Sequence, residues 1–214
     1  MTGVQTCALP IYRRGQRLII NMSLGGRFTD PSLEALVANN QDGALFVIAS
    51  GNDDANRLSD PASLSIRYRN VISVGASWGR IDRNGNATTV GDRISYPGFW
   101  GSNYGLGLTL MAPSEVIAAT ATLDGRSGVN SNMVNFNYEA TFNGTSAATP
   151  NAAGVASLVW SANPTLTASQ VQQILSQTAV NLGAAGYDNL TGHGMINADS
   201  AVRRAMAIAR GATV

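Results

Sequence analysis

Runs of mostly apolar residues, many of them β-branched, mark four predicted strands. They occupy residues 17–22, 44–49, 71–76 and 108–112. An apolar run of this length is typical of a parallel strand that is covered on both faces. Between the first two runs, Asp30 and the proline after it are typical of a helix N-terminus. This part of the chain therefore predicts a right-handed β-α-β unit.

The second half of the chain predicts a hairpin followed by three helices. Residues 116–122 and 134–142 alternate between apolar and polar positions, which favours an antiparallel pair of strands. One helix begins near Ser146, a second follows the cap residue Thr167, and the amphipathic segment 198–210 predicts the last. The complete order predicts an α/β fold of three layers, with a mostly parallel sheet and helices on both of its faces.

A turn of small residues carries the clearest chemical signal. It reads Asn-Gly-Thr-Ser-Ala-Ala-Thr-Pro over residues 143–150 and delivers Ser146 to the start of a helix. Pro150 is tolerated near a helix beginning, so it fixes that beginning close to the serine. The backbone N–H of Ser146 then has no helical partner and can hold the oxyanion of an acyl-transfer reaction. The local sequence is equally compatible with a residue that only caps a buried helix.

The same turn resembles the nucleophile motif Gly-Thr-Ser-x-Ala-x-Pro of the subtilisin-like serine proteases. Asn151 stands where that family usually has histidine. A lipase-type elbow, Gly-x-Ser-x-Gly, fits poorly because Ala148 occupies the place of its second glycine. Further segments resemble the family in the family's own order, at residues 20–26, 49–52, 110–113 and 192–198.

The resemblance implies a subtilisin-like fold, incomplete at its N-terminal side, and a serine endopeptidase site. Ser146 would be the nucleophile that forms the acyl-enzyme. The side-chain amide of Asn52 would be the second oxyanion donor, beside the backbone N–H of Ser146. The pocket for the substrate residue before the scissile bond would have two walls, one formed by Ser23, Leu24 and Gly25 and the other by Ala49, Ser50 and Gly51.

A serine also needs a base that takes its proton and a carboxylate that orients the base. The family carries both upstream of its Ser-Leu-Gly strand, but no Asp or His precedes Leu18 here, and His193 is the only histidine. We therefore expect residues 12–214 to be the C-terminal two-thirds of a peptidase domain, inactive as given. Two alternatives stay open: a peptide-binding pseudoprotease that lost its acid and base, and a hydrolase of another fold in which Ser146 pairs with His193.

Composition narrows the function classes. A net charge of +1, with 13% charged residues and no basic cluster, argues against a nucleic-acid partner. No apolar run approaches the roughly 20 residues of a membrane span. Cys7 is the only cysteine, which excludes a disulfide framework and a cysteine-rich metal site. We expect no cofactor, and the loop carboxylates lack a calcium-ligand spacing.

The first eleven residues differ in character from the rest. The apolar stretch within residues 1–11 is too short for a secretory signal peptide. These residues resemble the translation of a sequencing adapter, so we expect them to be non-native. The resemblance implies polypeptide substrates and a secreted or cell-surface parent protein. The sequence leaves the oligomeric state open.

Overall fold

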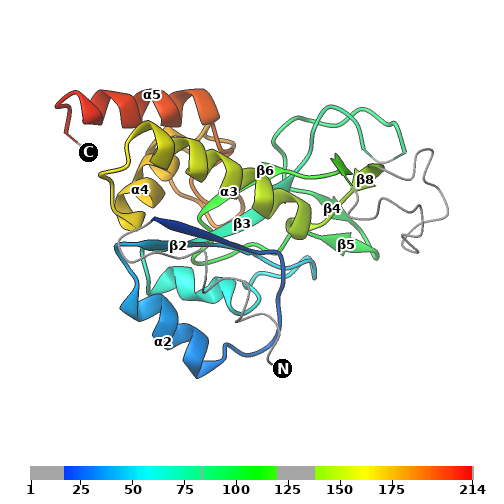
Figure 1. Ribbon diagram of the computed structural model, residues 1–214. Helices are drawn as coiled ribbons and strands as arrows, with labels where there is room; N and C mark the ends of the chain where they lie inside the picture. The colour runs from blue at the N-terminus through cyan, green and yellow to red at the C-terminus, as the bar shows by residue number, and fades with distance from the viewer. Residues whose placement is uncertain (1–16, 83, 120–137, 214) are drawn as a thin grey trace.

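A parallel sheet forms the centre of the molecule (Figure 1). The computed structural model describes residues 17–82, 84–119 and 138–213. Four strands lie in the order β1-β2-β3-β6, and each neighbouring pair is parallel. Their bounds are β1 Leu18–Met22, β2 Ala44–Ala49, β3 Val71–Ser77 and β6 Leu110–Pro113. The predicted strands are thus confirmed, with bounds that differ by at most two residues.

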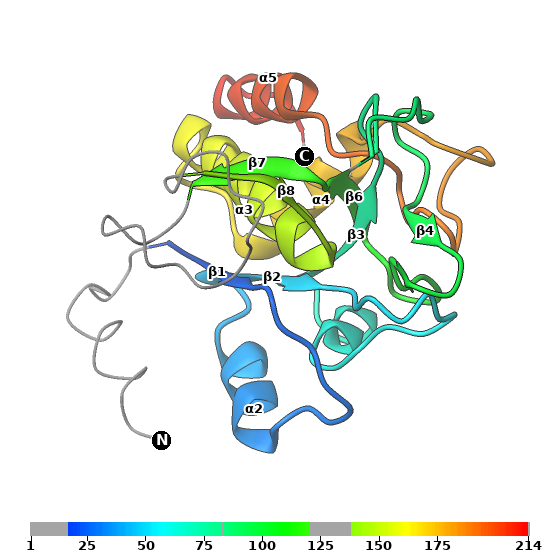
Figure 2. The same ribbon diagram turned by 90° about the vertical axis from the view of Figure 1, so that its right-hand side faces the viewer.

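Helices cover both faces of this sheet (Figures 1 and 2). One face carries α3 Thr145–Ala162, α4 Ala168–Thr178 and α5 Ala198–Ala209. The other face carries α2 Pro31–Asn39 and the short 3₁₀ helix η1 Ala62–Ile66. The predicted three-layer α/β architecture is therefore confirmed.

Alternate residues of the strands supply the two cores, as the pleat of a strand requires. In β2, Leu45 and Val47 pack under α3 to α5, whereas Phe46 and Ile48 face α2 and η1. All six residues of β2 are buried. This explains why an uninterrupted apolar run, rather than an alternating one, encodes the strand.

The central helix α3 contacts all four strands of the sheet. Its small side chains allow this close approach, and those of Ala148, Ala152 and Ala156 are fully buried against the sheet. The helix begins at Thr145, one residue before Ser146, as the position of Pro150 predicts. The nucleophile candidate therefore lies at the start of the helix that packs on all four strands.

The remaining elements follow the predictions with some differences. The hairpin is confirmed as β7 Val116–Ala119 paired with β8 Tyr138–Phe142, and the rest of its predicted span lies outside the described residues. Two short strands, β4 Ser95–Tyr96 and β5 Trp100–Gly101, and the 3₁₀ helix η1 were not predicted, because they are too short to show a period.

Candidate active site

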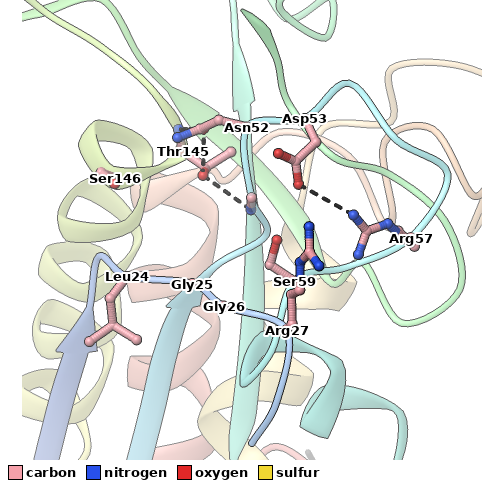
Figure 3. A pocket seen from close by; sticks show the side chains of 11 residues that line it. Leu24, Gly25, Gly26, Arg27, Asn52, Asp53, Arg57, Ser59, Thr145 and Ser146 are labelled. Carbon is pink, nitrogen blue, oxygen red and sulfur yellow. Dashed lines mark hydrogen bonds and ion pairs between the residues drawn. The ribbon is translucent and has the colours of Figure 1, made fainter.

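Three segments that are distant in sequence meet at one end of the sheet. The segment after β1, the segment after β2 and the first turn of α3 surround a cavity of about 340 Å³ (Figure 3). This is the carboxyl end of the parallel strands, where open α/β sheets bind their ligands. The cavity is lined by Leu24, Gly25, Gly26, Arg27, Gly51, Asn52, Asp53, Arg57, Ser59, Thr145 and Ser146.

The backbone at the start of α3 presents Ser146 to this cavity. Gly144 caps the helix with φ 84°, a conformation that favours glycine. A Cβ at Gly144 would also lie 3.2 Å from Nδ2 of Asn52, so a side chain would crowd the amide. Ser146 is the second residue of the helix, and its N–H belongs to the first turn, which has no partner within the helix.

The side chain of Asn52 is oriented by Thr145. The Oδ1 atom of Asn52 accepts hydrogen bonds from the backbone N–H of Thr145 at 2.8 Å and from its hydroxyl at 2.9 Å. Both donors fix this oxygen on the helix side, which leaves the Nδ2 donors directed away from it. Thr145 Oγ1 also accepts from the backbone N–H of Gly51 at 3.2 Å. A fully buried threonine thus joins the end of β2 to the start of α3.

Ser23 and Ser146 contact each other across the first turn of α3. Ser23 Oγ donates to the backbone oxygen of Ser146 at 2.8 Å. That oxygen would accept from residue 150 in a regular helix, but Pro150 has no N–H to donate. The Ser23 hydroxyl therefore replaces the helical hydrogen bond that the proline removes.

Among the residues that the structure describes, none supplies a base to the hydroxyl of Ser146. This hydroxyl donates a long hydrogen bond of 3.4 Å to the backbone oxygen of Ser23. A carbonyl oxygen accepts a hydrogen bond but does not take the proton at neutral pH. The geometry therefore presents a protonated serine.

His193 lies at the amino end of β6, away from the start of α3. Its backbone N–H donates to the oxygen of Thr109, which precedes β6, whereas Asn151 of α3 donates to the oxygen of Pro113 at the far end of that strand. Four residues of strand separate these two points by roughly 13 Å. The imidazole packs against the ring of Tyr187, with 5.2 Å between the two ring centroids. Burial lowers the pKa of His193 below its usual value. The structure brings no contact between His193 and Ser146.

The structure places the predicted substrate-binding residues in different ways. Leu24, Gly25 and Gly51 line the cavity, whereas Ser23 reaches Ser146 from beside it. Ala49 and Ser50 are buried at the end of β2 and do not line the cavity. Their role in substrate binding stays a prediction.

Several lining residues were missed by sequence reasoning. Thr145 is part of the Gly-Thr-Ser motif, and its position directly before Ser146 was the signal that could have identified it as a lining residue. Arg27, Arg57 and Ser59 lie outside every motif, and only the fold brings them to the cavity. No sequence signal marked these three residues.

The described residues form neither a metal-ligand cluster nor a membrane-spanning helix. No three His, Cys, Asp or Glu side chains in the described ranges group as ligands of a metal ion. Within the same part of the chain, no helix has the length and apolar character needed to cross a membrane.

Comparison with known proteins identifies the family. The sequence model of the subtilase family matches residues 5–194. The chain is 38% identical over 188 residues to alkaline elastase YaB from Bacillus sp. (strain YaB), covering 86% of this chain and 40% of that protein. It is 37% identical over 186 residues to subtilisin BL from Lederbergia lenta, covering 86% of this chain and 56% of the relative. The chain thus spans about half the length of these relatives or less, and it belongs to the subtilase family.

Proposed function

We propose that this chain carries the nucleophile and the oxyanion-binding groups of a serine endopeptidase. The observation that carries the proposal is the orientation of Asn52: Thr145 holds its Oδ1 atom, so the Nδ2 donors are available to the cavity that Ser146 lines. Membership of the subtilase family and the similarity to an alkaline elastase and to subtilisins support it.

The proposed chemistry follows from these positions. Once a base has taken the proton of the Ser146 hydroxyl, the Oγ atom attacks the carbonyl carbon of a peptide bond and the carbonyl oxygen becomes an oxyanion; when the C–N bond then breaks, the leaving amine takes up that proton. The Nδ2 group of Asn52 and the backbone N–H of Ser146 donate hydrogen bonds to that oxyanion. Loss of one such donor lowers turnover by about 10²–10³, a magnitude measured on a subtilisin.

The substrate backbone would bind beside the exposed segment that follows β1. Ser23 and Leu24 are exposed there, at the edge of the four-stranded sheet. An extended peptide can add to such an edge through backbone hydrogen bonds. The proposed substrates are therefore polypeptides, and we place the parent protein outside the cell or at its surface, as the family resemblance implies.

We also propose that the chain as given is not a competent protease. The only histidine of the sequence lies at the opposite end of β6 from Ser146. Without a positioned base, a serine hydroxyl at neutral pH remains protonated and attacks poorly. In a subtilisin, loss of the serine or of the histidine lowers turnover by about 2 × 10⁶.

A variant with a thiol tests the nucleophile and the oxyanion donors without a base. A cysteine thiol has a pKa of about 8.5, and a helix N-terminus lowers the pKa further, so Ser146→Cys supplies its own thiolate. The variant is made in a Cys7→Ser background and treated with peptide p-nitrophenyl esters. We expect one equivalent of nitrophenolate and an acyl-enzyme mass, and no such burst from Ser146→Ala.

Two matched variants separate the parts of the proposal. Asn52→Asp keeps an oxygen that accepts from Thr145 but removes the amide donors, and we expect acylation at position 146 to slow by about 10². Ser157→Cys places a thiol on the exposed side of the same helix, away from the cavity. If Ser146→Cys is acylated no faster than Ser157→Cys, the assignment of nucleophile and oxyanion donors is wrong.

A further inference from the structure

Two arginines and one aspartate line the cavity beside Ser146. Arg57 and Asp53 form an ion pair with 3.8 Å between Nη2 and Oδ2. Arg27 makes no hydrogen bond or ion pair with any residue that the structure describes, and Figure 3 shows its side chain extending from the segment after Gly26 toward the cavity. The lining therefore carries one positive charge that no neighbouring carboxylate balances.

Two acidic side chains that are close in sequence to the lining residues, Asp54 and Asp60, have other partners. Asp54 accepts hydrogen bonds from Arg93 and Ser95, and these bonds lower the pKa of its carboxyl group, Ser95 contributing most. The carboxylate of Asp60 accepts a hydrogen bond from Ser63. Neither carboxylate lines the cavity, so neither neutralises Arg27 there.

Ser59 lies between the two walls of the cavity. A Cβ built on Gly25 would lie 3.1 Å from Cβ of Ser59, and a Cβ built on Gly51 would overlap its Oγ atom. The side chain of Ser59 thus occupies the floor that two glycines leave open. Its Oγ atom accepts from Nδ2 of Asn103 at 3.3 Å, and its hydroxyl hydrogen has no acceptor among the described residues.

We propose that this cavity binds an acidic side chain, glutamate or aspartate, of the substrate residue before the scissile bond. The guanidinium of Arg27 and the hydroxyl of Ser59 donate to its carboxylate, which supplies the partners that both groups lack. A charge-assisted hydrogen bond of this kind is stronger than a neutral one. The proposal rests on the proposed function, because it assumes that the carbonyl of the same residue meets Ser146.

Other side chains fit this lining less well. A lysine or arginine side chain would meet Arg27 with like charge. Among the described lining residues, Leu24 alone offers a large apolar side chain. A large apolar side chain of the substrate would also cover the hydroxyl of Ser59 and the guanidinium of Arg27 without forming hydrogen bonds with them. An uncharged glutamine matches glutamate in shape, so the pair isolates the effect of charge.

The acylation assay tests this preference directly. The Ser146→Cys variant in the Cys7→Ser background is treated with p-nitrophenyl esters of acetyl-Ala-Ala-Xaa, where Xaa is Glu, Gln, Leu or Lys. We expect the glutamate ester to acylate about tenfold faster than the glutamine ester at low ionic strength. The ratio should decrease as salt is added, because the cavity is open to solvent.

Substitutions assign the preference to its residues. Arg27→Gln should bring the ratio of glutamate to glutamine close to one, and Arg27→Glu should favour the lysine ester. Asp53→Asn should raise the ratio, because it removes the one anion of the lining. Arg80→Gln is the matched control for net charge, since Arg80 is exposed and lies outside the cavity, and it should leave the ratio unchanged.

A binding measurement keeps this test separate from that of the proposed function. The ¹⁵N-labelled chain is titrated by NMR with acetyl-Ala-Ala-Glu-amide and acetyl-Ala-Ala-Gln-amide, which need no acylation. Tighter binding of the glutamate peptide that is lost in Arg27→Gln supports the acidic pocket even if Ser146→Cys is not acylated. Equal binding of the two peptides, or a preference that survives Arg27→Gln, overturns it. Acylation by all esters without a preference for glutamate would overturn the acidic pocket alone.

Discussion

Removing the hydroxyl of Thr145 tests directly whether this residue orients the side chain of Asn52. Thr145→Val keeps the shape of the side chain but removes a hydroxyl that donates to Asn52 and accepts from Gly51. Asn52 Oδ1 retains the backbone N–H of Thr145, whereas the N–H of Gly51 loses its acceptor. One lost hydrogen bond and one unsatisfied donor at a fully buried threonine should cost about 2 kcal/mol of the free energy of unfolding.

Urea unfolding and the acylation assay measure the two consequences. With an m-value of about 2.5 kcal/mol/M for a chain of this size, the urea midpoint should fall by about 0.8 M. In the Ser146→Cys background, acylation should slow by about tenfold, because Asn52 loses one of the two contacts that orient its amide. The two effects have one structural origin and should appear together.

Thr149→Val is the matched control for this prediction. Thr149 is also fully buried in α3, but its hydroxyl donates only to the backbone oxygen of Thr145, within the helix. Its removal leaves no donor without a partner, and we expect a change below about 0.5 kcal/mol. If Thr145→Val is as stable as Thr149→Val and is acylated at the parent rate, Thr145 does not orient Asn52.

The remaining predictions concern the cavity wall and the single histidine. Gly51→Ala should lower the free energy of unfolding by at least about 2 kcal/mol, because Gly51 has φ 110° and a Cβ there would overlap the side chains of Ser59 and Asn103. Gly26→Ala is the control, since a Cβ at Gly26 meets no atom within 4 Å. In the same urea experiment it should change the free energy of unfolding by less than about 0.5 kcal/mol. His193 should titrate by NMR below the ordinary histidine pKa of about 6.5, because burial disfavours its charged form. The unfolded chain then binds more protons, so the free energy of unfolding should decrease as pH falls from 6.5 through the pKa of the folded state, and His193→Gln should lack this decrease. A pKa at or above 6.5 would contradict the partial burial of the ring.

The strands and helices were predictable because each is encoded by its own residues. The run from Ala44 to Ala49 needs no knowledge of its neighbours to be identified as a strand buried on both faces. Likewise, Thr167 forms a capping box with Gln170, a signal contained in four residues. Prediction is less accurate where tertiary contacts decide the outcome: Leu36 has the helical spacing of an apolar face with Leu33 and Val37, yet it is 50% exposed.

The candidate site divides in the same way. Ser146 and Asn52 were predicted from motifs that resemble the family, and each stands at a fixed position relative to an element end, one residue into α3 and three residues after β2. Backbone geometry determines where those two side chains must be. Arg27 and Ser59 stand at no fixed distance from an element end. Each lies in a loop that reaches the cavity only through the tertiary fold, so the local sequence does not reveal its position.

This division has a physical consequence for how such a site can vary. The contacts that orient Asn52 and Ser146 run through Thr145, Gly51 and Ser23, and none of them involves Arg27, Arg57 or Ser59. We therefore expect that the charge of the cavity can change without moving the proposed nucleophile or the proposed oxyanion donors. Substitutions at Arg27 should alter which ester is preferred while the acylation rate of a preferred ester stays within about tenfold, whereas substitutions at Thr145 should slow all esters equally. A variant of Arg27 that slowed every ester by the same factor would show that the pocket and the oxyanion donors are mechanically coupled.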